Sequence, residues 1–188
     1  MALPPTPSQT IGPFLHIELP FAGEEQLVVS DRRDAIRLRG AIYDGNGDPV
    51  GDALVEIWQA NAAGRYAHPE DAREEIPLEE GFAGFGRCAT DAEGRFEFVT
   101  VKPGPVPGPD GSLQAPHIDV SVFARGLLKR LVTRIYFPDE SEANAADPVL
   151  STIEDPSQRE TLVAAAEDGA LRFDIRLQGE GETAFFVV

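Results

Sequence analysis

The sequence predicts an all-β fold, a β-sandwich of mixed strand topology formed by a single domain over residues 1–188. Short runs alternate between apolar and polar residues, which is the two-residue period of a β-strand. Turn-forming residues separate these runs, and the chain contains 18 Gly and 16 Pro. Since one short segment alone has a helical pattern, packed sheets must supply the hydrophobic core.

The strands of the first half follow one another at short intervals. We expect strands over residues 36–43, 53–59, 85–90 and 95–101. The first is followed by Asp-Gly-Asn-Gly-Asp at 44–48, and the fourth is preceded by Asp-Ala-Glu-Gly at 91–94; both sequences are typical of turns. The segment 44–48 superficially suggests a calcium loop. It has Pro49 where the loop glycine belongs, so we interpret it as a hairpin turn.

The second half adds further strands and one helix. Strands are expected over 117–124, 131–137, 171–177 and 183–187, the last two joined by a turn at 179–181. The helix is expected near 155–168. Asp155 is a suitable N-cap, Pro156 suits the first helical position, and Gly169 ends the pattern.

Two long segments have no clear periodicity. Residues 1–30 are interpreted as an extended arm that packs on a partner chain, since an irregular terminus in a compact domain is usually ordered by contact with something else. Residues 60–84 form an acidic and irregular connection, longer than is usual between two strands, and such loops are often functional.

Charge and composition exclude several classes of partner. The net charge of −16 argues against binding to nucleic acids and to anionic membranes, because both need clustered Lys and Arg. The one cysteine, Cys88, forms no intrachain disulfide. No signal peptide and no membrane-spanning stretch are evident, so we expect a cytoplasmic protein.

The residues with most chemical potential lie on the strand predicted over 117–124. His117 and Asp119 are two positions apart, so both side chains project from the same face. We expect them to be hydrogen-bonded neighbours, with Asp119 raising the pKa of His117. We expect Arg134 to pair with an acid inside the sandwich and Trp58 to lie in the core.

Several motifs in order resemble the intradiol ring-cleavage dioxygenases. They run from the arm to the C-terminal strands: Ser-Gln-Thr-x-Gly-Pro at 8–13, Val-Glu-Ile-Trp-Gln-Ala at 55–60, Phe-Gly-Arg at 85–87, Val-Lys-Pro-Gly at 101–104, Ala-Pro-His-Ile at 115–118 and Arg-Phe-Asp-Ile-Arg-Leu-Gln-Gly-Glu-Gly-Glu-Thr at 172–183. The resemblance covers nearly the whole chain. It implies the fold of that family, with iron as the family's cofactor.

The resemblance also implies a degenerate iron site. In the family two tyrosines and two histidines bind the iron; Tyr66 and His117 match one of each, while Val106 and Asp119 stand at the other two positions. Gln114 takes the place of an arginine that usually precedes the histidine pair. We therefore expect no metal and no catalytic residue in this chain.

A chain of this kind is expected to be the α subunit of a two-chain enzyme. The resemblance implies a homologous β subunit that binds Fe(III), a higher-order α–β oligomer, and cleavage of protocatechuate by O2 to 3-carboxy-cis,cis-muconate. This chain would help to form the substrate pocket through Thr10, Gly12, Pro13, Phe14 and Arg125. Gly12 permits close backbone approach, and Arg125 is suited to attract a carboxylate.

Two other functions stay open at this point. The chain could be a self-sufficient metalloenzyme with an altered site made of Tyr66, His117 and Asp119, with His68 as a further candidate. It could also be a β-sandwich binding module without enzymatic activity, since sandwiches have many functions.

Overall fold

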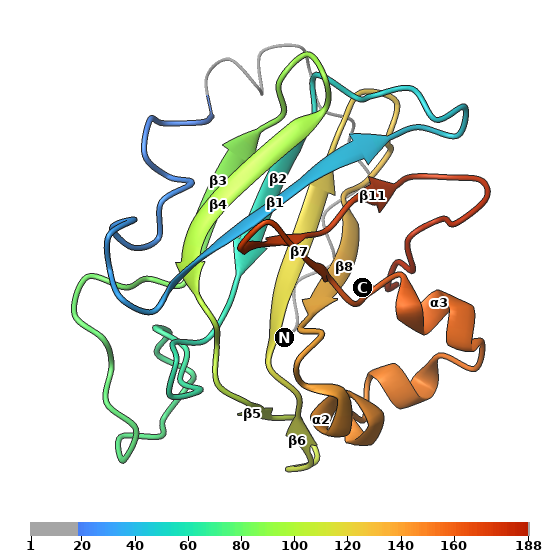
Figure 1. Ribbon diagram of the computed structural model, residues 1–188. Coiled ribbons are helices and arrows are strands. Elements are labelled where there is room, and N and C mark those ends of the chain that lie inside the picture. Colours follow the sequence, from blue (N-terminus) through green and yellow to red (C-terminus); the bar gives the residue numbers. More distant parts are fainter. Residues whose placement is uncertain (1–18, 188) are drawn as a thin grey trace, which may run out of the picture.

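Two β-sheets face each other across the hydrophobic core, with short helices beside one end (Figure 1). The computed structural model describes residues 19–187. In the first sheet β1 (Ala35–Tyr43) pairs antiparallel with β4 (Arg95–Val101) and parallel with β10 (Ala170–Arg172) and β11 (Ile175–Arg176), and β9 (Ala165–Glu167) joins β10. The second sheet has the order β3 (Phe85–Ala89), β2 (Leu54–Trp58), β7 (His117–Phe123) and β8 (Leu131–Tyr136). The mixed sandwich is therefore confirmed.

Six predicted strands have the bounds that the sequence indicates to within one residue. These are the strands expected over 36–43, 53–59, 85–90, 95–101, 117–124 and 131–137, now β1, β2, β3, β4, β7 and β8. The turn after β1 is also present, with the Asp44 amide donating to the Asp48 carbonyl at 2.9 Å. The alternation of apolar and polar residues predicts these strands correctly because each strand has one face toward the core.

The core forms where the inner faces of the two sheets meet. The first sheet contributes Leu38 and Ile42 from β1 with Phe96 and Phe98 from β4. The second sheet contributes alternate residues of β2, β7 and β8: Val55, Ile57, Ile118, Val120, Val122 and Ile135. All of these side chains are buried. Each strand consequently projects its remaining residues from the outer face of its sheet.

The helical prediction is right at its start and wrong in its second half. The Asp155 carboxylate accepts a hydrogen bond from the Ser157 amide at 2.8 Å, but α3 extends over Pro156–Glu160 only. The chain then runs beside β8, where the Tyr136 amide donates to the Leu162 carbonyl at 2.8 Å. Pairing with β8 buries Leu162 and satisfies the backbone, so the helical pattern is overridden.

Several short elements have no clear signal in the sequence. After β8 come α2 (Ser141–Ala146) and a 3₁₀ helix, η1 (Leu150–Thr152), which precede α3. β5 (Val106–Pro107) and β6 (Leu113–Gln114) form a two-residue ribbon at the end of the molecule where α2 lies (Figure 1). β9 is the segment that replaces the predicted end of the helix.

The strand predicted over 171–177 is present in two pieces. β10 and β11 keep one register against β1, but the backbone ladder is interrupted between them, where the Asp174 carboxylate accepts the Ala41 amide at 3.1 Å. The strand predicted over 183–187 is wrong: the segment makes only a bridge between Val132 and Phe186. Between β10 and β11, the Asp174 carboxylate thus takes the place of a main-chain carbonyl as acceptor.

The described part of the predicted arm lies along its own chain. The Leu27 amide donates to the Val99 carbonyl at 2.8 Å, and the Val99 amide donates to the Glu25 carbonyl at 2.9 Å. The Arg87 amide donates to the Glu24 carbonyl at 3.2 Å. Residues 19–30 thus cover β3 and β4, and the rest of the predicted arm lies outside the described residues.

Gly40 is the position in β1 that tolerates a side chain least. A Cβ atom there would lie 1.8 Å from the Phe173 carbonyl oxygen, which is backbone and has little freedom to move. We predict that Gly40→Ala lowers the free energy of unfolding by about 3 kcal/mol, because overpacking forces strands apart. Urea unfolding of the full chain measures this, with the neighbouring exposed Arg39→Ala as control. Equal midpoints for the two variants would contradict the prediction.

Candidate functional site

The candidate site lies on the outer face of the second sheet, opposite the core. His117 and Asp119 project from β7 on this face, while the intervening Ile118 is fully buried in the core. Directly across from them on β8 are Tyr136, opposite His117, and Arg134, opposite Asp119. The prediction that His117 and Asp119 share one face is confirmed, with Nε2 of His117 3.9 Å from Oδ2 of Asp119.

His117 is buried and has one unpartnered nitrogen. Its Nδ1 lies 2.7 Å from the Ala115 carbonyl oxygen, which can only accept, so Nδ1 holds the proton. Its Nε2 has no hydrogen-bond partner among the described residues. Burial, followed by the positive charge of Arg134, lowers the pKa of His117. Asp119 does act to raise this pKa, as expected, but burial and Arg134 outweigh it. The expected hydrogen bond between His117 and Asp119 is wrong, because their nearest nitrogen and oxygen atoms are 3.9 Å apart.

Arg134 connects Asp119 to the rest of the site. Its Nε donates to Oδ1 of Asp119 at 2.8 Å, and its Nη1 donates to Oε1 of Gln114 at 2.6 Å. The Arg134 side chain is 19% exposed. The prediction that Arg134 pairs with an acid is confirmed, but the pair is on the outer face of the sheet and not inside the sandwich.

Tyr136 and Asp147 support this cluster from beneath, and the sequence reasoning missed both. The Tyr136 hydroxyl donates to Oδ1 of Asp147 at 3.2 Å, and Oδ2 of Asp147 accepts the Ala115 amide at 2.8 Å. Both side chains are fully buried. Tyr136 could have been found because it is two residues after Arg134 on a predicted strand; Asp147 lies in a loop and had no such signal.

Tyr66 reaches the site from the long loop over residues 60–84. Its ring stacks on Trp58 with centroids 5.9 Å apart and planes 7° from parallel. Burial, with the nearby negative charge of Asp119, raises the pKa of Tyr66 to about 12, so its phenol stays protonated near neutral pH. Trp58 is half-buried beneath Tyr66, and the expectation that it lies in the core is wrong.

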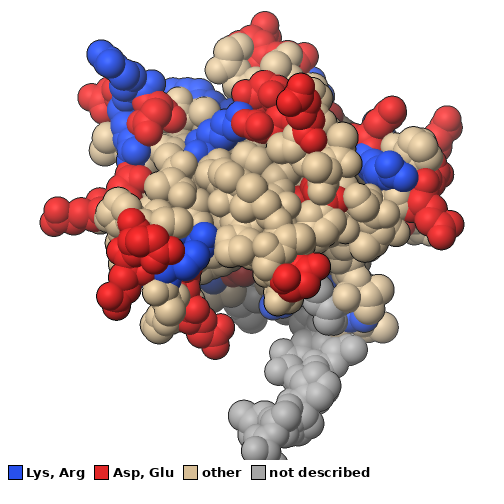
Figure 2. Space-filling model, turned by 90° about the horizontal axis from the view of Figure 1, so that it is seen from below, with Lys and Arg blue, Asp and Glu red and all other residues tan. Residues whose placement is uncertain are grey.

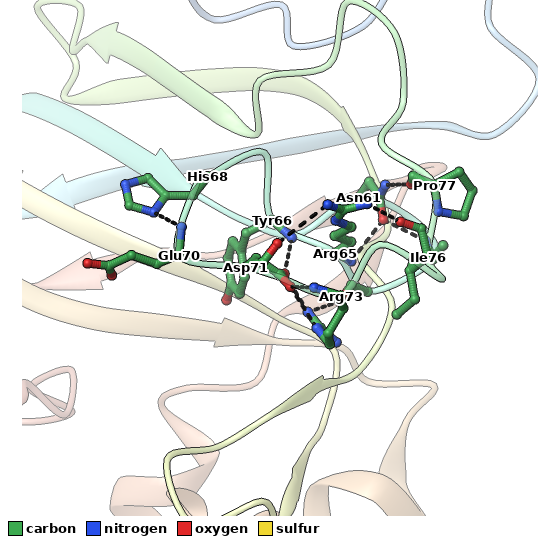
Figure 3. A network of polar contacts seen from close by, with 11 residues as sticks. Asn61, Arg65, Tyr66, His68, Glu70, Asp71, Arg73, Ile76 and Pro77 are labelled. Carbon is green, nitrogen blue, oxygen red and sulfur yellow. Dashed lines mark hydrogen bonds and ion pairs between the residues drawn. The ribbon is translucent and has the colours of Figure 1, made fainter.

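A network of polar contacts holds the loop in place (Figure 3). Oδ1 of Asn61 accepts the amides of Ala63 and Arg65, both at 3.0 Å. Nη1 of Arg65 donates to the Ile76 carbonyl at 2.5 Å, and Nδ2 of Asn61 donates to the Pro77 carbonyl at 3.0 Å. The irregular segment is thus fixed by side chains that take the place of strand hydrogen bonds.

Asp71 fixes the part of the loop that carries Tyr66. Its carboxylate accepts the Tyr66 amide at 2.8 Å and a 2.6 Å hydrogen bond from Nη2 of Arg73, which also donates to the Gly64 carbonyl at 2.7 Å (Figure 3). The Arg73 hydrogen bond and the two backbone amides that Asp71 accepts lower the pKa of Asp71 well below its usual range. Asp71 therefore stays ionised and keeps Tyr66 over Trp58.

A hollow of about 700 Å³ opens beside Tyr66. Most of its lining is aromatic or charged, with Ala72 and Pro107 as the small apolar members. The other lining residues are Trp58, Tyr66, His68, Glu70, Asp71 and Arg73. His68 packs edge-on against Trp58 and is otherwise exposed. Volume and aromatic lining suit a small planar molecule, but the arginine in this hollow is already paired with Asp71.

The four positions of the predicted degenerate site converge. Val106 is the backbone partner of Gln114 across the β5–β6 ribbon, and the Gln114 side chain accepts a hydrogen bond from Arg134. Arg134 also forms an ion pair with Asp119, which lies beside His117. The charge of Asp119 also acts on Tyr66. The positions that the sequence could align only by motif are thus neighbours in space.

These residues do not fit an iron ion of the kind the family uses. Val106 is buried and offers no ligand, Tyr66 is held as a neutral phenol, and a guanidinium already neutralises Asp119. A ferric ion needs several anionic oxygen ligands. Over residues 19–187, no group of three or more His, Cys, Asp and Glu is placed to hold a metal.

Arg125, the one predicted substrate-binding residue within the described range, is not brought to this cluster. Arg125 follows the far end of β7 from His117; its side chain is 72% exposed and forms an ion pair with Asp52. Thr10, Gly12, Pro13 and Phe14 lie outside the described residues. Among residues 19–187, no helix has the length and apolar character needed to cross a membrane.

Comparisons with known proteins agree with the fold. The family described as Dioxygenase matches residues 24–179. The chain is 48% identical to the protocatechuate 3,4-dioxygenase alpha chain of Pseudomonas putida, covering 98% of this chain and 96% of that one. It is 43% identical to the protocatechuate 3,4-dioxygenase beta chain of Burkholderia cepacia, covering 79% of this chain and 60% of that one.

A solved structure has a similar fold. It is the dioxygenase domain of a dioxygenase and carbohydrate-binding protein fusion from Streptomyces sp. SirexAA-E, with a TM-score of 0.57 and 27% identity. The similarity covers 94% of this chain and 99% of that one.

Removing the charge of Asp71 tests the loop network. We predict that Asp71→Asn lowers the free energy of unfolding by about 2 kcal/mol at pH 7, because charged hydrogen bonds to Arg73 and to Tyr66 are lost. Since folding lowers the pKa of Asp71, the wild-type advantage is present above about pH 4 and shrinks as pH falls below it.

Urea unfolding at pH 7 and at pH 3 measures the free energy of unfolding of the wild-type chain and of Asp71→Asn. The neighbouring Glu70→Gln is the control, with an expected change within about 0.5 kcal/mol. A loss for Asp71→Asn that stayed constant between the two pH values would show that the carboxylate charge is not responsible.

Proposed function

The chain belongs to the intradiol ring-cleavage dioxygenase family, and we propose that it is the α subunit of a protocatechuate 3,4-dioxygenase. The observation that carries this proposal is 48% identity with such an alpha chain over almost the full length of both proteins. The family is iron-dependent, and a β chain that is homologous to this chain exists among its relatives.

The proposed division of labour follows from the degenerate site. The homologous β subunit binds Fe(III), and the pair cleaves protocatechuate with O2 to 3-carboxy-cis,cis-muconate in aromatic catabolism in the cytoplasm. Val106 and the Asp119–Arg134 ion pair support the view that this chain contributes no iron ligand. The same two features disfavour a self-sufficient metalloenzyme, and the identity with the alpha chain disfavours a binding module.

This chain would complete the substrate pocket of its partner. We assign that role to Thr10, Gly12, Pro13 and Phe14 in the N-terminal arm, which would pack on the β subunit, and to Arg125. Two facts support the role of Arg125. The guanidinium is largely exposed, and its ion pair with Asp52 is at the surface, where exchange for another carboxylate costs little.

One face of the molecule is suited to such a partner. Figure 2 shows uncharged residues across the centre of this face and acidic side chains around much of its rim. β6 and the loop over 60–84 reach this end of the molecule (Figure 1), and they carry the exposed apolar side chains Leu113 and Leu78. An uncharged centre with a charged rim is the usual composition of a subunit interface, and further pairs would build the higher oligomer.

Co-purification with the β chain tests the proposed function. We expect this chain alone to be colourless and iron-free, and the co-expressed pair to contain one Fe(III) per pair, to absorb visible light through tyrosinate-to-iron charge transfer, and to cleave protocatechuate. Metal analysis, absorbance and oxygen uptake are the readouts. Iron and ring cleavage in the single chain, or an iron-loaded pair without activity on protocatechuate, would overturn it.

The role of Arg125 is tested in the same complex. We predict that Arg125→Ala raises KM for protocatechuate about 10-fold and changes kcat little, because the carboxylate is bound equally in the ground and transition states. Arg130→Ala, another exposed arginine in the following loop, is the control and should leave KM unchanged. Equal KM values for the two variants would remove Arg125 from the pocket.

A further inference from the structure

Arg134 lies beside His117 and Asp119, the two side chains of this cluster that could share a metal ion. The 3.9 Å between Nε2 of His117 and Oδ2 of Asp119 is a separation that one metal ion can bridge with bonds of about 2.1 Å. The other oxygen of Asp119 is taken by the guanidinium of Arg134 at 2.8 Å. The cluster thus has two suitable donors with a fixed cation attached to one of them.

His117 gives an independent sign of a binding position. Its side chain is 2% exposed, and its Nε2 has no partner among the described residues. Because Nδ1 donates to the Ala115 carbonyl, the bare lone pair of the neutral ring is on Nε2. A buried nitrogen without a partner is uncommon, and this arrangement of a backbone carbonyl on Nδ1 is the one that orients imidazole as a ligand.

Arg134 itself is held firmly and cannot turn away. Its Nη1 donates to Oε1 of Gln114 at 2.6 Å, and the Tyr136 hydroxyl lies 3.5 Å from the same nitrogen. Tyr136 is anchored in turn by the buried Asp147. The guanidinium therefore stays in place as a permanent positive charge, since arginine does not lose its proton in proteins.

We propose that Arg134 acts as an internal cation that replaces the metal ion of this site and excludes one, and that loss of its charge opens a divalent-metal site on His117 and Asp119. The inference rests on geometry in this chain and does not depend on the proposed function. A transition ion such as Co2+ or Zn2+ is the appropriate ligand class, because imidazole and carboxylate are ligands that such ions accept.

Two substitutions separate charge from hydrogen bonding. Arg134→Gln retains an amide donor for Asp119 and removes the charge, whereas Arg134→Lys retains the charge. We expect no measurable binding of Co2+ at His117 and Asp119 in the wild-type chain or in Arg134→Lys. Binding to Arg134→Gln should be tighter by at least about 100-fold, because a unit charge beside a divalent ion is strongly unfavourable at low effective dielectric.

The titration uses the full chain with CoCl2, followed by the visible absorbance of bound Co2+ and by metal analysis after gel filtration. His117→Gln added to Arg134→Gln should abolish the new binding, which places the ion on this histidine. Equal Co2+ affinity of Arg134→Gln and Arg134→Lys would overturn the proposal. So would binding that persists in the double variant.

A second measurement needs no variant and covers the case in which Arg134→Gln does not fold. The wild-type chain has 3 histidines, whose imidazole protons can be followed by NMR while Co2+ is added. Paramagnetic broadening should reach the exposed His68 and spare His117. Broadening of His117 in the wild-type chain would show that Arg134 does not exclude the ion.

Discussion

The two-residue period of β7 is the constraint on which the site depends. Ile118, Val120 and Val122 face the core and fix the strand between β2 and β8. The same alternation places His117 and Asp119 on the opposite face. Since a shift by one residue would send the apolar set outward, the core holds the register of the site.

The fold is therefore stable for reasons that have nothing to do with a metal. The sandwich buries apolar side chains from both sheets. The buried Thr100 hydroxyl donates a hydrogen bond to Oε1 of the buried Gln59 at 2.7 Å. The site lies outside this core, on a surface that a loop covers. Residues at metal-ligand positions on this face can be substituted while the core keeps the chain folded. In a structural zinc domain, loss of a metal ligand would unfold the protein.

Charge balance explains how the outer face remains intact without an ion. Asp119 next to a buried imidazole would be a poorly compensated carboxylate, and Arg134 compensates it from the neighbouring strand. Asp71 and Arg73 solve the same problem in the covering loop. For Asp71, the hydrogen bond from Arg73 lowers the pKa and keeps the carboxylate ionised.

Local sequence determined what depends on local periodicity. It predicted the bounds of β1, β2, β3, β4, β7 and β8 and the shared face of His117 and Asp119. It could not give the partner of Asp119, because cross-strand register joins residues that are far apart in the chain.

Tertiary structure alone decided the rest. It ended α3 at Glu160 because β8 offers hydrogen bonds to the next residues, and it divided the strand over 171–177 because Asp174 accepts the Ala41 amide. It also buried His117 and placed Arg134 beside it, so that the His117 pKa is lowered although Asp119 acts to raise it. Sequence sets which side of a strand a residue faces, but the sign of its electrostatic environment depends on which distant side chains the fold places beside it.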